Sequence, residues 1–425
     1  MATTPATPAG ELQPKIVHKR TVRVLILVLI LGLVAFALKF YFDHRTDPDF
    51  GAVETNGMVA AIELQRDGQR LVVFDKDGKR IEPPGYPDGA IERDIAWRPD
   101  GNRIFFVSNR DKKAFQIYRW SPVSGVDPQV KTQENRGKSN ISFPPAATAD
   151  PDQKFLMTTG GYVVEYDPKN QKGHQVLPPI EHEVAQSADP TGEGGGSTGQ
   201  FSSMYSQLGD SFRTARWCAP DTIAAVMRGD NGEVLIVQRI ALHGEKLEPP
   251  KMVAIADRID LDVSPADGTI VFTATKVRWP AKTALPKSQR YPHYLAFYRL
   301  GDSNATLIAP TVMGDDCYGS PAVSPQGDRV LVVTGTYDPA SGGLVPKNLV
   351  TVPIQSGGIL AKSVLVDAPV FEPTWSPDGK RIAYVKRTPS GNRAIFVANN
   401  DGSDEKNLSG DKGNFSSPKF SPQTR

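Results

Sequence analysis

The sequence predicts an all-β fold, namely a seven-bladed β-propeller that is closed by its N- and C-terminal strands and preceded by one transmembrane helix. A turn proline recurs after β-prone runs, at Pro99, Pro151, Pro220, Pro265, Pro325, Pro377 and Pro422. These turns predict seven first strands, although the weak repeat starting near Ala146 leaves six or eight blades as alternatives. The 38 Gly and 36 Pro among 425 residues are typical of short strands joined by tight turns.

The clearest repeat is Phe371 to Gly410. It begins with a β-prone run that ends at Trp375, and the following S-P-D-G suits a type I turn, because Pro presets φ at the second position. Two apolar runs, 381–385 and 394–398, predict a buried hairpin, and N-D-G leads into a poorer fourth strand that ends at Leu408. Such a four-stranded unit of about 40 residues has the size of a propeller blade.

These motifs resemble the repeat of TolB-type β-propellers, in which W-S-P-D-G is followed by R-I-A-Y, an I-x-V strand, D-G-S and N-L-T. The last motif is N-L-S here, and a second, fair match is A-W-R-P-D-G-N-R-I-F-F-V-S within Ile91 to Ser124. The resemblance implies the propeller fold and a binding role in the cell envelope. The family's α/β domain before the propeller is missing and a membrane segment takes its place, so no partner or binding residue is carried over.

The N-terminal part predicts a membrane anchor. Residues 1–21 are expected to be a disordered cytoplasmic tail, Val22 to Phe42 a transmembrane signal-anchor helix, 43–56 a linker, and 57–425 the propeller. Basic residues precede the apolar run at Lys15, Lys19, Arg20 and Arg23, which predicts a cytoplasmic N-terminus and a propeller that is periplasmic or extracellular. A cleavable signal peptide is the alternative, because Ala35-Phe36-Ala37 matches a small-x-small cleavage site.

Both ends of the propeller are predicted to complete one blade. Met58 to Leu64, Leu71 to Phe74 and the residues around Ile81 read as second, third and fourth strands without a first. The missing first strand is predicted at the other end, around Ser417 to Gln423. Such ring closure removes the exposed sheet edges that promote aggregation.

One face of the ring is predicted to carry the long connections. Lys276 to Pro292 and Gly335 to Pro346 lie between second and third strands, and Ile180 to Ser211 lies between blades, whereas the turns on the other face are expected to be short. The chain enters from the membrane on the short-turn face. The long-loop face is therefore expected to point away from the bilayer, where long loops on a rigid scaffold carry binding residues.

The candidate binding residues are aromatic, arginine and acidic side chains in or beside these connections. They are Arg278, Trp279, Arg290, Tyr291, His293, Asp315, Asp316, Tyr318 and Tyr337. Aromatic residues and Arg predominate at interface hot spots, and paired acids suit a cation or a basic side chain. The alternative is structural: the aromatic residues hold their loop onto its blade, and the two aspartates cap their own backbone.

Several classes of site are not predicted. A net charge of +2 indicates no general affinity for nucleic acid. The two cysteines are expected to be free thiols, with Cys218 at the end of one first strand and Cys317 just before another. No zinc-like spacing, P-loop or nucleophile elbow occurs, so neither a metal, a cofactor nor a catalytic residue is predicted.

Together these features predict a membrane-anchored platform that binds an unidentified envelope protein through its long-loop face. A carbohydrate-binding or carboxylate-dependent hydrolytic propeller is one alternative, which requires carboxylates to converge at the opening of the ring. A structural subunit of an envelope machine is another, which requires an exposed apolar flank.

Overall fold

Short antiparallel strands account for almost all regular structure in the computed structural model. It describes residues 55–111, 114–132, 136–144, 153–179, 205, 209, 211–230, 232–240, 248–278, 292–310 and 316–422. The chain divides into two units, Met1–Gly51 and Ala52–Arg425. The predicted tail, the membrane segment and most of the linker lie outside the described residues. Within the described ranges, no helix has the length and apolar character needed to span a bilayer.

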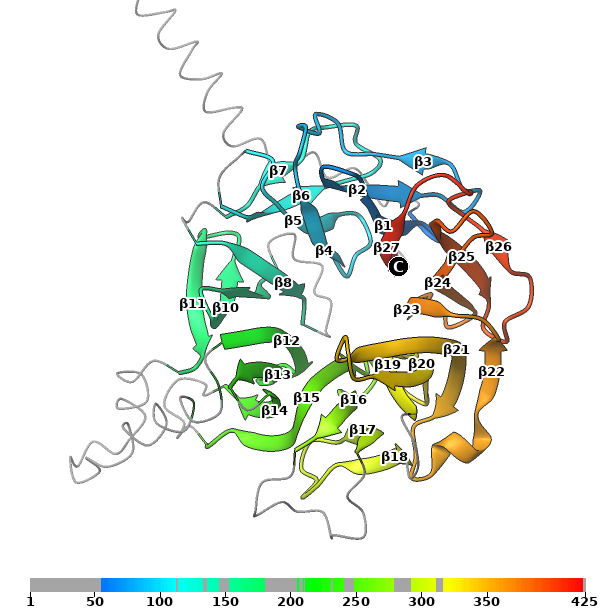
Figure 1. Ribbon diagram of the computed structural model, residues 1–425. Helices are drawn as coiled ribbons and strands as arrows, with labels where there is room; N and C mark the ends of the chain where they lie inside the picture. Colours follow the sequence, from blue (N-terminus) through cyan, green and yellow to red (C-terminus); the bar gives the residue numbers. More distant parts are fainter. Residues whose placement is uncertain are drawn as a thin grey trace, which may run out of the picture. The chain divides into compact units, whose positions relative to one another are not determined.

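The strands of the second unit form six hydrogen-bonded sheets (Figure 1). One sheet joins both ends of the unit, in the order β27 (Phe415–Phe420), β1 (Val59–Leu64), β2 (Gln69–Phe74) and β3 (Arg80–Ile81). The next contains β4 (Glu92–Trp97), β5 (Ile104–Ser108), β6 (Gln116–Trp120) and β7 (Gln129–Val130). A third contains β8 (Lys138–Ser142), β9 (Phe155–Thr159), β10 (Tyr162–Asp167) and β11 (Lys172–Leu177).

A seven-stranded sheet follows, with two further four-stranded sheets after it. The large sheet contains β12 (Ser211–Ala219), β13 (Thr222–Gly229), β14 (Gly232–Arg239), β15 (Lys251–Val263), β16 (Ile270–Val277), β17 (His293–Tyr298) and β18 (Thr306–Pro310). The next sheet contains β19 (Asp316–Val323), β20 (Arg329–Asp338), β21 (Gly343–Pro353) and β22 (Ser363–Val366), with the short helix η2 (Gly358–Ala361) before β22. The last contains β23 (Val370–Trp375), β24 (Arg381–Arg387), β25 (Arg393–Asn399) and β26 (Lys406–Asn407).

The long strand β15 belongs to two halves of the seven-stranded sheet. Its first half pairs with β14 as far as Ala256, and the second half pairs with β16 from Ala256 onward. The first half is therefore the outer strand of one four-stranded group, and the second half is the inner strand of the next.

The inner strands close into a ring. They contact one another in the cyclic order β4, β8, β12, β15, β19, β23 and β27, and β27 contacts β4 again. Figure 1 shows these strands around the centre, with the other strands of each sheet outside them. Because β27 pairs with β1, from Val59↔Phe420 to Glu63↔Phe415, the predicted closure by both ends is confirmed.

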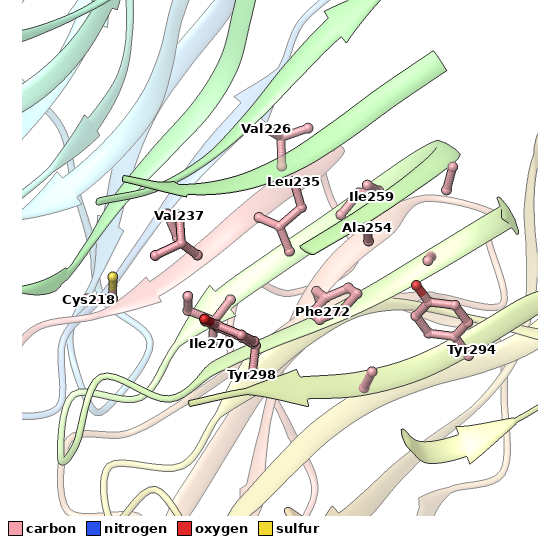
Figure 2. Close-up of a cluster of buried hydrophobic side chains, with 14 residues drawn as sticks. Cys218, Val226, Leu235, Val237, Ala254, Ile259, Ile270, Phe272, Tyr294 and Tyr298 are labelled. Carbon is pink, nitrogen blue, oxygen red and sulfur yellow. The ribbon is translucent and has the colours of Figure 1, made fainter. Parts of the chain in front are cut away.

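The core lies between neighbouring sheets and between the strand groups of the large sheet, because strands such as β5 and β17 are buried on both faces. Figure 2 shows one such cluster, in which Val226, Leu235, Ile259 and Phe272 come from four successive strands, β13 to β16. Burial on both faces explains the nearly continuous apolar runs of the middle strands. Cys218 lies in this cluster, and both cysteines are buried free thiols, as predicted.

Four details of the sequence interpretation are wrong. The first strand of the weak repeat is β8, which begins at Lys138 rather than near Ala146. Cys317 lies within β19 rather than before it. The expected insertion Gly335 to Pro346 mostly continues the hairpin of β20 and β21, because Thr336↔Val345 and Asp338↔Gly343 remain paired. The short-turn face also carries two longer connections, from β8 to β9 and from β14 to β15.

Candidate functional site

A bulge recurs at one level of the inner strands. Five non-glycine residues have positive φ there: Asp94 (52°), Asn140 (56°), Ser320 (51°), Glu372 (51°) and Ser417 (54°). The pairing register shifts at each of them. Such left-handed conformations cost free energy outside Gly, so their repetition in five strands indicates a shared structural demand. We call these five residues the bulge layer.

Side chains of the bulge layer link adjacent inner strands. Asp94 Oδ2 accepts the backbone N–H of Asn140 at 3.2 Å, and the Asn140 amide donates to the carbonyl of Arg213 at 3.4 Å. Glu372 likewise accepts the backbone N–H of Ser417. The bulge thus leaves a backbone N–H without a partner in its own sheet, and a carboxylate on the preceding inner strand accepts it.

Arginines neutralise the acids at this level. Arg93 lies 3.7 Å from Asp94, and Arg393 lies 3.8 Å from Glu372. On β15, Asp260 is 3.3 Å from Arg258 and 3.7 Å from Arg213. Each of these carboxylates therefore already has cationic partners.

A second group of charged residues lies on the inner strands, and we call it the axial cluster: Arg216 of β12, Asp262 of β15 and Lys419 of β27. Burial lowers the pKa of the Arg216 guanidinium, and Asp262 and Asp94 oppose that shift. Burial also lowers the pKa of Lys419, with Asp262 opposing. Lys419 is nevertheless solvent-accessible. The lowered pKa and the solvent accessibility are both explained if protein closely surrounds the Lys419 side chain but leaves it in contact with water.

Two of the described members of the predicted patch, His293 and Tyr337, meet where the seven-stranded sheet contacts the sheet of β19 and β20. The rings of His293 and Tyr337 lie 5.3 Å apart, and the Lys276 ammonium lies 4.6 Å from the Tyr337 ring. His293 Nδ1 accepts the backbone N–H of Lys276 at 3.1 Å. Because His293 and Tyr337 are 3% and 7% exposed, they join two sheets rather than face a partner.

Of the other described members, two face solvent and one is half-buried. Arg278 is exposed and pairs with Asp257 at 2.7 Å. Asp316 is exposed and lies 3.8 Å from the Lys347 ammonium, whereas Tyr318 is half-buried. Burial and the nearby Asp316 charge raise the pKa of Tyr318 to about 12, so its hydroxyl stays protonated at neutral pH. We call Arg278, Asp316 and Tyr318 the joint patch.

The remaining predicted site residues, Trp279, Arg290, Tyr291 and Asp315, lie outside the described residues. In the ranges that are described, no three His, Cys, Asp or Glu side chains come together in a way that could hold a metal ion.

The sequence interpretation missed the axial cluster. The signal in the sequence was a charged residue immediately before the large aromatic residue near the end of an inner strand, as in Arg216-Trp217 and Lys419-Phe420. The clearest repeat has Thr374 at this position. Only the arrangement of the inner strands around the ring brings such residues near one another.

Comparison with known proteins supports the fold. No protein-family model matches the chain, and no curated protein matches its sequence. Among solved structures, a puromycin hydrolase gives a TM-score of 0.56 at 10% identity, over 84% of this chain and 52% of that one. An oligogalacturonate lyase in complex with manganese gives 0.50 at 11% identity, over 82% and 84% of the two chains.

TolB from Acinetobacter baumannii is also similar, with a TM-score of 0.42 at 12% identity over 86% of this chain and 83% of that chain. The fold of this chain is a β-propeller, as the closed ring of inner strands shows. Identities this low show the fold alone, because propellers host many unrelated activities. This chain spans about half of the puromycin hydrolase chain.

Proposed function

We propose that this chain is a seven-bladed propeller that binds a protein partner through the joint patch and serves as a platform in the cell envelope. The seven blades are the five four-stranded sheets and the two groups that share β15. The segment Val22 to Phe42 anchors the chain in the cytoplasmic membrane, with the N-terminus in the cytoplasm and the propeller outside it.

The observation that carries this proposal is the joint patch on a rigid support. Arg278 and Asp316 are exposed charges of opposite sign at the end of β16 and the start of β19, two strands in contact, and Tyr318 lies near Asp316. On neighbouring strands, His293 and Tyr337 pack against each other across two sheets. Such preorganised support reduces the entropy lost on binding, and Arg and Tyr are favoured at interface hot spots.

A second candidate is a structural subunit that docks through the outer edge of one blade. β22 pairs only with β21, which leaves one side of the strand without a neighbour in its sheet. Val364 on β22 is 51% exposed, and Leu360 in η2 is 92% exposed. Exposed apolar residues beside an open strand edge are suited to a permanent contact.

A carboxylate-dependent hydrolase is less well supported. Acids do occur on the inner strands, but Asp94 and Glu372 accept backbone N–H groups and lie beside arginines. Their oxygens hold adjacent blades together, whereas a general acid has to exchange its proton with a substrate.

Site-specific photo-crosslinking in cells tests the platform. A benzoylphenylalanine at position 278 or 316 of the full chain is expected to give one and the same crosslinked species. Lys380 and Asp401 serve as matched controls. They are exposed in the β23–β24 and β25–β26 turns, which belong to the opposite face of the ring from positions 278 and 316. A product common to all four positions, or none at 278 and 316, contradicts the proposal. A product from position 360 or 364 alone favours the structural subunit.

A further inference from the structure

Lys419 lies on β27, one of the inner strands of the ring. Its charge interacts with Arg216 on β12 and Asp262 on β15, as well as with Glu372 on β23. On the ring, β27 contacts β23 and β4, whereas β12 contacts β8 and β15. A side chain on β27 reaches β12 and β15 only across the axis.

Lys419 has no acid within ion-pair distance among the described residues, and its ammonium makes no hydrogen bond to them. Its backbone carbonyl is occupied, because it accepts the Trp97 indole N–H at 3.0 Å. That bond holds the strand in place while the ammonium remains accessible to solvent. The ammonium keeps three donors for another group.

The Arg216 guanidinium is held in place by hydrogen bonds from only one of its nitrogens to the described residues. Its Nη1 donates to the Asn140 side-chain oxygen and, at 3.0 Å, to the carbonyl of Ala215. Neither Nη2 nor Nε makes a hydrogen bond to the described part of the chain. The guanidinium therefore has a free edge with two donors, the geometry that matches a carboxylate.

The charges of the axial cluster do not balance. Within the axial cluster two cations face one carboxylate, Asp262, whose Oδ2 already accepts the backbone N–H of Val323 at 2.9 Å. Outside it, Asp94 also interacts with Arg216, and Glu372 with Lys419. The acids of the bulge layer, by contrast, lie beside arginines. One additional negative charge at the axis would neutralise the cluster.

We propose that Arg216 and Lys419 form a binding site for the carboxylate of a small organic acid at the axis of the ring. The free edge of the guanidinium binds the two carboxylate oxygens, and the Lys419 ammonium completes the site as a point charge. Protein surrounds both side chains closely although solvent reaches them, and this lowers the pKa of both cations. A contact with an anion is therefore stronger here than on an open surface. This site is separate from the joint patch and does not depend on the platform role.

Lysine footprinting of the full chain in detergent tests the site. Reductive methylation with formaldehyde is followed at each lysine by mass spectrometry, without anion, with sodium acetate, and with sodium phosphate. Saturating acetate is expected to slow labelling of Lys419 about fivefold or more. Labelling of Lys380, an exposed turn lysine, should not change.

Variants assign the protection to the cluster. Arg216→Gln is expected to abolish protection of Lys419 by acetate, whereas Arg216→Lys keeps the charge and retains part of it. The matched control Arg387→Gln removes an exposed arginine at the end of β24 and should leave protection intact. Circular dichroism establishes that each variant is folded.

Two results would overturn the proposal: equal labelling of Lys419 with and without acetate, or protection that survives Arg216→Gln. Protection by phosphate but not by acetate would overturn the assignment to a carboxylate. If Arg216→Gln does not fold, comparison of wild-type labelling with and without acetate still decides whether the site exists.

Discussion

The blade β23–β26 and the closing blade β27-β1-β2-β3 have the same strand order but depend on different contacts. In the first, the turn is held within six residues: the Ser376 hydroxyl donates to Asp378 at 2.6 Å and accepts the N–H of Arg381 at 2.9 Å. In the closing blade, Ser421 donates its N–H to the carbonyl of Met58, and Leu64 donates to that of Asn414. One blade is therefore stabilised locally, and the other joins segments far apart in the chain.

This difference bears on how the ring folds. A contiguous blade closes short loops at little entropic cost, whereas the closing blade must bring both ends of the propeller together. The core beneath the closing blade contains Phe74, Phe415 and Phe420, together with Val385 and Ile395 of the contiguous blade. The ends are thus fastened onto a blade that forms easily. Removing contacts of the closing blade should destabilise the whole ring, whereas removing contacts within a turn should destabilise only its own blade.

Removal of β27 should have the largest effect. A chain that ends at Asn414 loses the inner strand of the closing blade and exposes the edge of β1, so we expect loss of cooperative thermal unfolding and aggregation. A chain that ends at Pro422 keeps β27 and is the control. Wild-type-like melting of the shorter chain would show that the ring does not require closure.

Phe415→Ala should have the next largest effect. Phe415 is 1% exposed, and its ring packs edge-on against Phe74 with centroids 5.5 Å apart. Truncation leaves a cavity beneath the closing blade and should lower the free energy of unfolding by about 3 to 5 kcal/mol. Urea denaturation of the full chain, wild type and variant, measures this change in the free energy of unfolding. A loss below about 1 kcal/mol would mean that the blade rearranges to fill the space.

Trp375→Phe and Trp217→Phe form a matched pair on two inner strands. Both indoles are buried, but Trp375 Nε1 donates to the carbonyl of Ala322 at 2.9 Å, whereas Trp217 Nε1 has no hydrogen-bond partner in the described structure. Trp375→Phe removes this hydrogen bond, whereas Trp217→Phe removes none, so Trp375→Phe should cost about 1 kcal/mol more. Thermal unfolding of both variants checks this, and equal losses would contradict it.

The smallest effect is expected for the Glu63–Arg80 pair in the closing blade. The two Arg80 nitrogens lie 3.0 and 2.7 Å from the Glu63 oxygens, and this hydrogen bonding holds the pKa of Glu63 below its usual value despite burial. The pair therefore stabilises the fold above the ordinary carboxyl pKa, and the benefit disappears as pH falls through the folded pKa.

Glu63→Gln should consequently reduce the loss of stability between neutral and acidic pH by about 1 kcal/mol or less. Melting temperatures at several pH values, compared between wild type and variant, provide the measurement. Glu82→Gln, which changes a more exposed partner of Arg80, is the control. An identical pH dependence in wild type and Glu63→Gln would exclude the pair as a contributor.

The candidate site was only partly predictable. Arg278, His293 and Asp316 stood out because aromatic and charged residues flank long connections, and they lie on or beside strands β16, β17 and β19, which contact one another. Tyr337 is buried because the β20–β21 hairpin extends through the residues that were expected to form a loop. No residue pattern in that stretch distinguishes an extended hairpin from a loop. Arg216 and Lys419 were overlooked because each is an isolated charge in its own repeat, and a repeat pattern carries no information about its partners across the ring.

The sequence by itself determined the β-rich repeat and its turns, since Pro, Gly and short apolar runs act over a few neighbouring residues. It also indicated the pairing of both ends of the propeller, because one incomplete repeat at each end completes the other. Tertiary structure alone decided the register of the bulges, the use of β15 in two groups and the meeting of Arg216 with Lys419. These features depend on how separate sheets pack against one another, so the energies that select them arise between residues distant in the chain.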